Sequence, residues 1–280
     1  MSAALALLAS GLWGTSDFLG GTVSRRLRAV QVLAVSQVLS CAVLLVVLGS
    51  GLGGTPAGPV GNWLGWSLLA GATWAGAMAA LYTALARGTM GVVAPIAAGG
   101  TVLPVLLGLA AGERPAPLQL AGVAVAFTGV VLSAGPDLRG GSGRQGAAVG
   151  LALLAAVLFG VEIWALARGS AASVPATLLG MRVTSAALVV AAALARRSAE
   201  RVGPRDLPPL LALGLLDLAA TAAYAVASRG ALVSVVAVLA SLYPAVTVVL
   251  ARQVHGERLR PVQVAGVVAV LAGAVVTSLG

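Results

Sequence analysis

The chain has 280 residues, of which 59% are hydrophobic and only 9% are charged. A soluble domain carries about 25% charged residues, so this composition excludes a soluble protein and indicates a chain surrounded by lipid. The net charge of +9 does not indicate a nucleic-acid partner, because all 17 basic residues are arginines and nearly all lie between apolar runs. Membrane proteins keep the charges that set their orientation in such places.

Apolar segments long enough to cross a bilayer follow one another along the chain, each about 20 residues long. We predict ten membrane-spanning helices, at residues 2–23, 29–49, 62–86, 90–111, 117–135, 146–167, 175–195, 208–228, 231–252 and 261–279. The first segment lacks the basic start and the cleavage site of a signal peptide, so we expect it to remain as a helix. The connections are too short to fold alone. The sequence therefore predicts an all-α integral membrane protein whose first partner is the lipid bilayer.

The second half of the chain repeats the first. Residues 112–132 and 256–276 share ten identities in 21 aligned positions, among them Gly-Glu-Arg at the start of each. Two shorter matches support the alignment, Tyr82-x5-Gly with Tyr224-x5-Gly and Leu12-Trp-Gly with Leu158-Phe-Gly. These identities indicate an internal duplication.

The duplication divides the chain into two units, residues 1–140 and 141–280, with five predicted helices each. Because five is odd, the second unit enters the membrane from the side opposite to the first. Many secondary transporters use such an inverted repeat for alternating access. We therefore expect ten helices arranged as two inverted five-helix repeats.

Three motifs along the chain suggest a family. They are Leu12-Trp-Gly-Thr-Ser-Asp-Phe, Ser241-Leu-Tyr-Pro-Ala-Val-Thr, and the Gly-Glu-Arg that follows the fourth helix of each half, at Glu113 and Glu257. In these motifs and their order the chain resembles the drug/metabolite transporter superfamily, in its ten-helix EamA-domain branch. The resemblance implies a multi-pass protein of the cell membrane that transports small metabolites. The first half departs from the pattern, with Gly100 where the second half has Pro244.

Three acidic residues lie inside predicted helices, where a charged side chain costs about 2.5–3.5 kcal/mol. Asp17 follows Trp13 by four residues, so both share one helical face, and Ser16 is adjacent. A carboxylate beside an aromatic ring can bind an ammonium group by charge and by cation–π attraction. We predict that these three residues bind substrate. The alternative for Asp17 is an ion pair with Arg25 or Arg26.

Glu162 lies in the middle of the sixth predicted helix, and the repeat places it opposite Ser16. We predict that Glu162 and Asp17 line the substrate site and couple transport to protons, because each can release a proton as substrate binds. The alternative for Glu162 is a structural ion pair with Arg182 or Arg168.

Asp217, in the eighth predicted helix, begins a polar stripe that continues to Thr221 and Tyr224. Arg182, whose repeat equivalent is Gln37, could neutralise an acid, hold a substrate carboxylate or reach the interface. We predict Asp217, Tyr224 and Arg182 as substrate-binding residues, while a near-interface position for Asp217 stays open.

Aromatic residues and prolines complete the predicted site. Trp74 and Tyr82 share a face of the third helix, and Tyr243 lies in the ninth, so we predict all three to line the cavity, although tyrosine and tryptophan also form interfacial belts. Proline within a helix removes a hydrogen bond and can kink the helix at a binding site. We therefore predict hinges or kinks at Pro95, Pro104 and Pro244.

These features predict a secondary active transporter, an exporter or exchanger of a small polar metabolite such as an amino acid or organic cation. The cavity is expected near the midplane, between the repeats. The alternative is proton-coupled efflux of multiple drugs or organic cations. A remote alternative is an intramembrane aspartic-type enzyme built on Asp17 and Asp217. One histidine and one cysteine leave little for a metal site, so no cofactor is expected, and we expect a monomer or weak homodimer.

The arginines also bear on orientation. Connections after the odd-numbered predicted helices hold thirteen arginines, counting Arg252 at the very end of the ninth helix, and those after the even-numbered helices hold three. The positive-inside rule places the arginine-rich connections in the cytoplasm and both termini outside. The family resemblance implies both termini inside, so the two expectations disagree.

Overall fold

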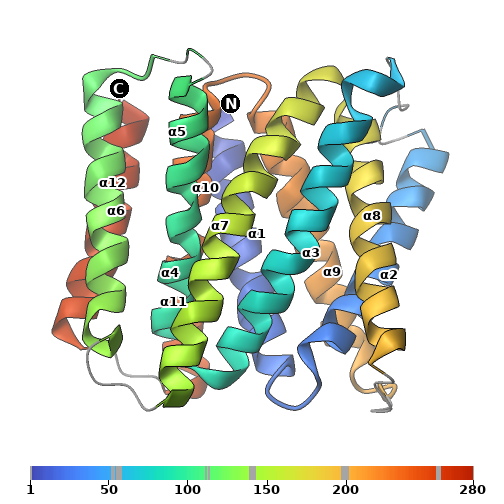
Figure 1. The fold of residues 1–280 in the computed structure, drawn as a ribbon, viewed down its shortest axis with the longest axis horizontal. Helices are drawn as coiled ribbons and strands as arrows, with labels where there is room; N and C mark the ends of the chain where they lie inside the picture. Colours follow the sequence, from blue (N-terminus) through green and yellow to red (C-terminus); the bar gives the residue numbers. More distant parts are fainter. Residues whose placement is uncertain are drawn as a thin grey trace.

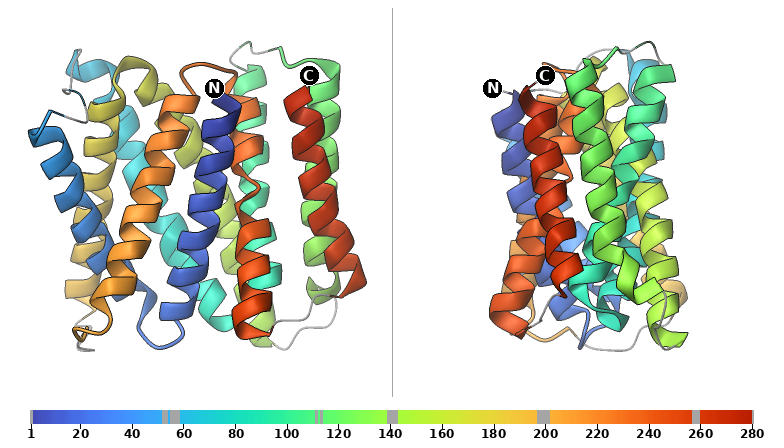
Figure 2. Two further views of the ribbon diagram at one scale, coloured as in Figure 1. Left: turned by 180° about the vertical axis from the view of Figure 1, so that it is seen from behind. Right: turned by 90° about the vertical axis from the view of Figure 1, so that its left-hand side faces the viewer.

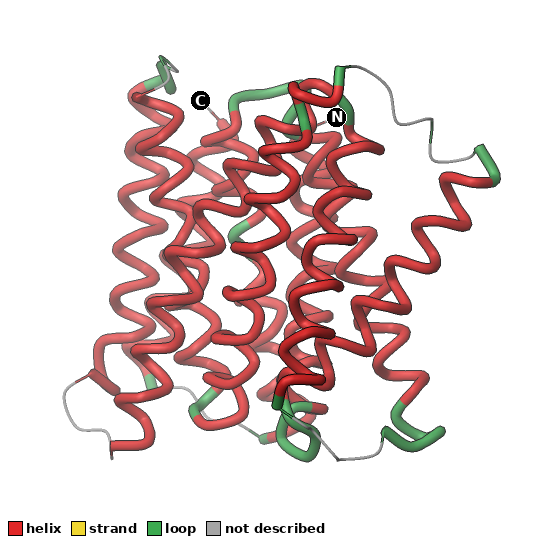
Figure 3. Tube along the Cα trace, turned by 45° about the vertical axis from the view of Figure 1, so that its right-hand side comes forward, coloured by secondary structure: helices red, strands yellow, loops and turns green. Residues whose placement is uncertain are grey.

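The computed structural model describes residues 2–51, 54, 59–110, 112, 114–138, 143–196, 202–256 and 260–279; Glu113 and Glu257 lie outside these ranges. Within them the secondary structure is helical and contains no strand (Figure 3). The α-helices are α1 (Ser2–Val23), α2 (Ala29–Gly49), α3 (Leu64–Arg87), α4 (Met90–Ala98), α5 (Val102–Ala110), α6 (Pro117–Leu138), α7 (Gly143–Ala172), α8 (Val174–Ala195), α9 (Leu207–Ala227), α10 (Val233–Ala240), α11 (Tyr243–His255) and α12 (Pro261–Leu279). The 3-10 helices are η1 (Val60–Asn62) and η2 (Gly99–Thr101).

Six helical segments of the described chain are long and apolar enough to cross a membrane. They are Ala29–Gly49, Leu64–Arg87, Gly146–Ala172, Val174–Ala195, Leu207–Ala227 and Val235–His255. Large apolar side chains on their outer faces are exposed, among them Val46, Leu153 and Leu194. Lipid is the medium that such a surface requires, so the protein is an all-helical, multi-pass membrane protein.

Two predicted helices are interrupted midway. The helix predicted at 90–111 is observed as α4, η2 and α5, which end at Ala110, and the helix predicted at 231–252 is observed as α10 and α11, which begin at Val233. Pro104 cannot donate a hydrogen bond to the carbonyl of Gly100, four residues earlier, and Pro244 cannot donate to that of Ala240. Both breaks therefore lie where a proline removes the helical donor.

The helices of the two halves run in opposite directions. α1 starts at the upper end of the molecule in Figure 1 and descends, whereas α7, its repeat equivalent, starts at the lower end and ascends (Figure 1). The two chain termini lie at the same upper end in both views of Figure 2.

The two halves interleave instead of forming separate bodies. α1 packs on α9 and, equivalently, α7 packs on α3; α2 also packs on α9, as α8 does on α3. α6 lies along α12, its repeat equivalent, at one end of the molecule (Figure 2). Each helix of one half thus has a principal partner in the other half, related by the same approximate symmetry.

Glycines permit the closest contacts between the halves. A Cβ on Gly14 would lie 2.6 Å from the Cβ of Val246 and would collide with the carbonyl oxygen of Tyr243, at the α10–α11 break. A Cβ on Gly160, the repeat equivalent of Gly14, would lie 2.5 Å from the carbonyl oxygen of Gly100, at the α4–α5 break. The hydroxyl of Thr247 donates to the carbonyl of Gly14 at 3.0 Å. α1 and α7 therefore lie directly against the two breaks.

Gly14→Ala and Gly160→Ala should each lower the stability of the protein by about 1–3 kcal/mol, the usual cost of overpacking. Gly11→Ala in α1 and Gly150→Ala in α7 are matched controls, because a Cβ at either position meets nothing within 4 Å. Alanine is the better helix former, so the controls should be neutral or slightly stabilised. Thermal unfolding in detergent measures the difference. Equal melting temperatures for Gly14→Ala and Gly11→Ala would show that this close approach is absent.

Candidate functional site

A pocket lies where the two halves meet and encloses about 500 Å³ of space, including its opening. Helices α1, α3 and α4 of the first half and α7, α9, α10 and α11 of the second contribute side chains to it. The lining residues are Trp13, Asp17, Trp74, Met78, Ala97, Ala98, Phe159, Glu162, Ile163, Asp217, Ala240, Ser241 and Tyr243.

The lining follows the internal repeat. Trp13 and Asp17 of α1 occupy the positions equivalent to Phe159 and Ile163 of α7, and all four line the pocket. α3 and α9 each contribute one side chain as well: Gly71 lies against the backbone of α8 and Gly214 against that of α2, and Trp74 and Asp217 of the same two helices line the pocket. The pocket is therefore built from equivalent positions but carries unlike side chains.

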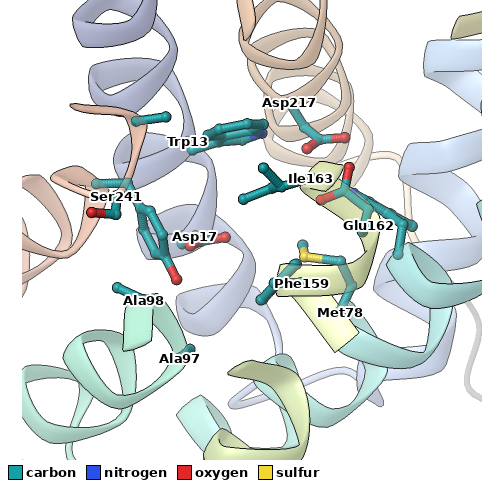
Figure 4. Close-up of a pocket in the computed structure, with 13 residues that line it drawn as sticks. Trp13, Asp17, Met78, Ala97, Ala98, Phe159, Glu162, Ile163, Asp217 and Ser241 are labelled. Atoms are coloured by element: carbon teal, nitrogen blue, oxygen red, sulfur yellow. The ribbon is translucent and has the colours of Figure 1, made fainter. Parts of the chain in front are cut away.

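Six of the ten residues predicted to bind substrate line this pocket, namely Trp13, Asp17, Trp74, Glu162, Asp217 and Tyr243. Glu162 and Asp217 lie on one side, with Asp17 and Ser241 on the other and Trp13 above them (Figure 4). The three acidic side chains are almost completely buried. A charged group in such a place must be paired, solvated by the pocket or neutralised by a proton.

The acids differ in what they contact. Asp217 forms an ion pair with Arg182 and accepts a hydrogen bond from the side-chain amide of Gln37 at 3.4 Å. Glu162 has an oxygen, Oε1, that is buried without a hydrogen-bond partner among the described residues. The charge of Asp217 is thus neutralised by Arg182, whereas Oε1 of Glu162 has neither a cation nor a hydrogen-bond donor beside it among the described residues.

Arg182 lies behind the pocket and does not line it. Its Nη1 donates to Asp217 and, at 3.3 Å, to Gln37. Its Nη2 donates to the hydroxyl of Thr221 at 2.7 Å and to the carbonyl of Asp217 at 3.2 Å. The guanidinium carbon also lies 5.6 Å from the ring centre of Trp74. Arg182 is completely buried.

Gln37 and Arg182 are repeat equivalents, yet they touch each other. Equivalent residues of two symmetry-related units meet only next to the symmetry axis, so the approximate axis passes between α2 and α8 at this point. Arginine on one side and glutamine on the other make the centre of the molecule asymmetric in charge. The carboxylate of Asp217 compensates the positive charge of Arg182, which has no counterpart at Gln37.

The other predicted residues lie outside the lining. The hydroxyl of Ser16 donates to the carbonyl of Leu213 in α9 at 3.3 Å. The ring of Tyr82 fills the space beside Gly20, and Tyr224 packs on Trp13 with ring centres 5.7 Å apart. These three residues join α1 to α3 and α9, and Tyr224 reaches the pocket only through Trp13.

Of the three prolines, Pro104 and Pro244 lie directly after the breaks, in α5 and α11, and Pro95 lies within α4. Two of the arginines considered as partners of Asp17 and Glu162 make other contacts. Arg26 pairs with Asp206 at 2.8 Å, and Arg168 lies over the rings of Trp66 and Trp164.

Several lining residues were not predicted from the sequence. Phe159 and Ile163 could have been found by transferring Trp13 and Asp17 through the repeat. Ala97 and Ser241 likewise occupy equivalent positions in the two halves. Met78 shares the helical face of Trp74. Ala98 and Ala240 carry no chemical signal and are found only because the breaks bring them to the pocket.

Comparison with protein families matches residues 146–279 to the EamA-like transporter family. These residues form an EamA-like transporter domain. The domain includes α7 and α9 to α11, which supply Glu162, Asp217 and Tyr243 to the pocket. The match confirms the family resemblance seen in the sequence and supports a membrane transporter of this type. A transporter family also points away from an enzyme.

Among solved structures, one crystal structure matches with a TM-score of 0.76 and 20% sequence identity. The match covers 99% of this chain and 96% of that chain. At this identity the likeness concerns the fold alone, and it extends the comparison from the EamA-like domain to the whole chain. No curated protein matches the sequence.

Proposed function

We propose that the protein is a secondary active transporter of a small polar metabolite, an exporter or exchanger in the cell membrane. The observation that carries the proposal is a pocket lined by equivalent helices of both halves and bearing three buried acids. A site between two inverted units can be opened to either side by rocking one unit against the other.

The proposed architecture is ten membrane-spanning helices in two inverted repeats, residues 1–140 and 141–280. The opposite directions of α1 and α7 and the equivalent packing of the halves support it. α1 has 22 residues, enough to span about 30 Å at 1.5 Å per residue. α4 with α5 would form one span and α10 with α11 another.

The charges of the pocket support coupling to protons. Three carboxyl groups face one guanidinium, and the pocket is otherwise apolar apart from two hydroxyls. Ionising all three acids would leave two uncompensated negative charges in a low-dielectric site, which is costly. A monocationic substrate can compensate one of these charges and a proton the other, or protons on Asp17 and Glu162 can compensate both. Substrate and protons would therefore exchange for each other.

Proton-coupled efflux of multiple drugs or organic cations is the second candidate. The apolar part of the lining favours it, since aromatic and aliphatic side chains accept varied organic groups. An aspartic-type enzyme is disfavoured, because a catalytic dyad shares one proton between two carboxyls and Asp217 is already paired with Arg182.

Transport by purified protein in liposomes tests the proposal. We expect at least one member of a panel of amino acids, polyamines and organic cations to accumulate or exchange, faster with a pH gradient than without. If no member of the panel moves under either condition, with protein inserted in both orientations, the proposed function is wrong.

We further propose that the arginine-rich connections face the cytoplasm and the termini face outward. Residues 24–28 and 202–206 of these connections lie at the end of the molecule opposite the termini (Figure 1). Single cysteines introduced into a Cys41→Ser background test this. Ala231→Cys, at the end of the termini, should react with a membrane-impermeant maleimide in intact cells, and Pro204→Cys only after permeabilisation. The reverse pattern would place the termini inside.

A further inference from the structure

We propose that the pocket selects a monocationic amine with an apolar body and rejects the amino acid that differs from it by one carboxylate. This inference rests on the proposed transport function and names its substrate class. It follows from which charges are available to a ligand and which are already used within the protein.

The lining offers negative charge to a cation. Asp17 and Glu162 both reach the pocket, and Oε1 of Glu162 has no hydrogen-bond partner among the described residues. Trp13 lies one helical turn before Asp17 in the same lining, so an ammonium group beside this carboxylate also faces an aromatic ring. Charge attraction and cation–π attraction then act on the same ligand atom.

The lining offers no positive charge to a carboxylate. Among its thirteen residues none is basic. The nearby guanidinium of Arg182 is outside the lining, and both of its terminal nitrogens donate hydrogen bonds to Gln37, Asp217 and Thr221. Its Nε has no hydrogen-bond partner among the described residues, but turning the two terminal nitrogens toward a substrate would leave Asp217 as a buried, unpaired carboxylate, which is costly.

At the α10–α11 break, the backbone N–H groups of Ser241 and Leu242 are already used within the protein. The N–H of Ser241 donates to the carbonyls of Ala237 and Val238, and that of Leu242 donates to Leu239. The hydroxyl of Ser241 donates to Val238 at 2.7 Å, and Pro244 has no N–H. A ligand carboxylate at this break would therefore replace existing hydrogen bonds instead of completing open ones.

The rest of the lining suits an apolar body. Trp74, Met78, Phe159 and Ile163 face the same space as the acids. An aromatic or branched aliphatic group of a small amine can be removed from water there.

Matched pairs of compounds test the inference, because each pair differs only in the carboxylate. Phenethylamine with phenylalanine and tyramine with tyrosine are suitable, measured by counterflow in liposomes and by tryptophan fluorescence in detergent, since Trp13 and Trp74 line the pocket. We expect the amine to bind and move at least about tenfold better than its amino acid, a factor that corresponds to ~1.4 kcal/mol.

Equal or better transport of the amino acids would overturn the inference while the proposed function stood. If neither member of either pair moves, the inference is also wrong, and the wider panel decides whether the transport function fails with it. Asp17→Asn should abolish amine binding, whereas Asp206→Asn, which changes an acid paired with Arg26 outside the pocket, should retain it. Unchanged amine binding by Asp17→Asn would remove Asp17 from the site.

Discussion

Glu162→Gln should abolish substrate accumulation driven by a pH gradient while leaving the exchange of substrate for substrate intact. Glutamine has nearly the same shape as glutamate but cannot take up and release a proton. The substitution should be tolerated structurally, because Oε1 of Glu162 has no hydrogen-bond partner to lose among the described residues. A pH difference of one unit stores about 1.4 kcal/mol per proton, which supports about tenfold accumulation at one-to-one exchange. The variant should show no accumulation above equilibrium.

Two measurements in liposomes separate these effects, accumulation under an imposed pH gradient and counterflow without one. Asp206→Asn is the matched control, since it also removes one carboxylate but lies outside the pocket. If Glu162→Gln accumulated substrate as the parent protein does, Glu162 would not carry the coupled proton. Loss of counterflow together with accumulation would instead assign Glu162 to substrate binding.

Arg182→Gln should be the most destabilising single substitution of a charged residue in the described chain. It leaves Asp217 buried without its cation, and breaking a buried ion pair from one side costs about 3–5 kcal/mol. We expect the melting temperature in detergent to fall by on the order of 10 °C. The double variant Arg182→Gln with Asp217→Asn should recover much of the loss, because no charge is then left uncompensated.

Arg26→Gln is the control for this prediction. Its side chain is 57% exposed in its ion pair with Asp206, and exposed pairs contribute about 0–1 kcal/mol. If Arg182→Gln melted at the same temperature as Arg26→Gln, the central ion pair would not be a structural element. If the double variant were no more stable than Arg182→Gln alone, the loss would come from packing against Trp74 instead of from charge.

The sequence predicted the helices well because a membrane-spanning helix is recognised by the apolar composition of a continuous stretch of residues. A run of about 20 apolar residues is a property of neighbouring positions, and so is a connection rich in arginine. The observed helices α1 and α2 have the predicted bounds, and α8, α9 and α12 agree within a residue or two. The helix breaks at Gly99–Thr101 and after Ala240 arise because Pro104 and Pro244, a few residues later, lack a backbone N–H. The prolines in the sequence therefore indicated that a break exists but did not give its position.

The site was predicted in part, for a related reason. A spacing of four residues puts Trp13 and Asp17 on one face of α1, but it does not say which helix that face meets. Glycine contacts decided this, because Gly14 and Gly160 let α1 and α7 approach the broken helices of the opposite half. The pocket therefore forms between halves that the sequence showed only to be related.

The amino-acid sequence by itself predicted that this chain is a membrane protein, that its second half repeats its first, and that three acidic residues lie within its helices. Only the tertiary structure decided which acid is already neutralised. From the sequence, Arg182 could form an ion pair with either Glu162 or Asp217, since both acids lie on helices of the same half as Arg182. The packing of α8 beside α9 and α2 brings Arg182 to Asp217 and Gln37 and leaves an oxygen of Glu162 unpaired in the pocket. Charge compensation depends on distance in space, and distance in space is fixed by how the helices pack.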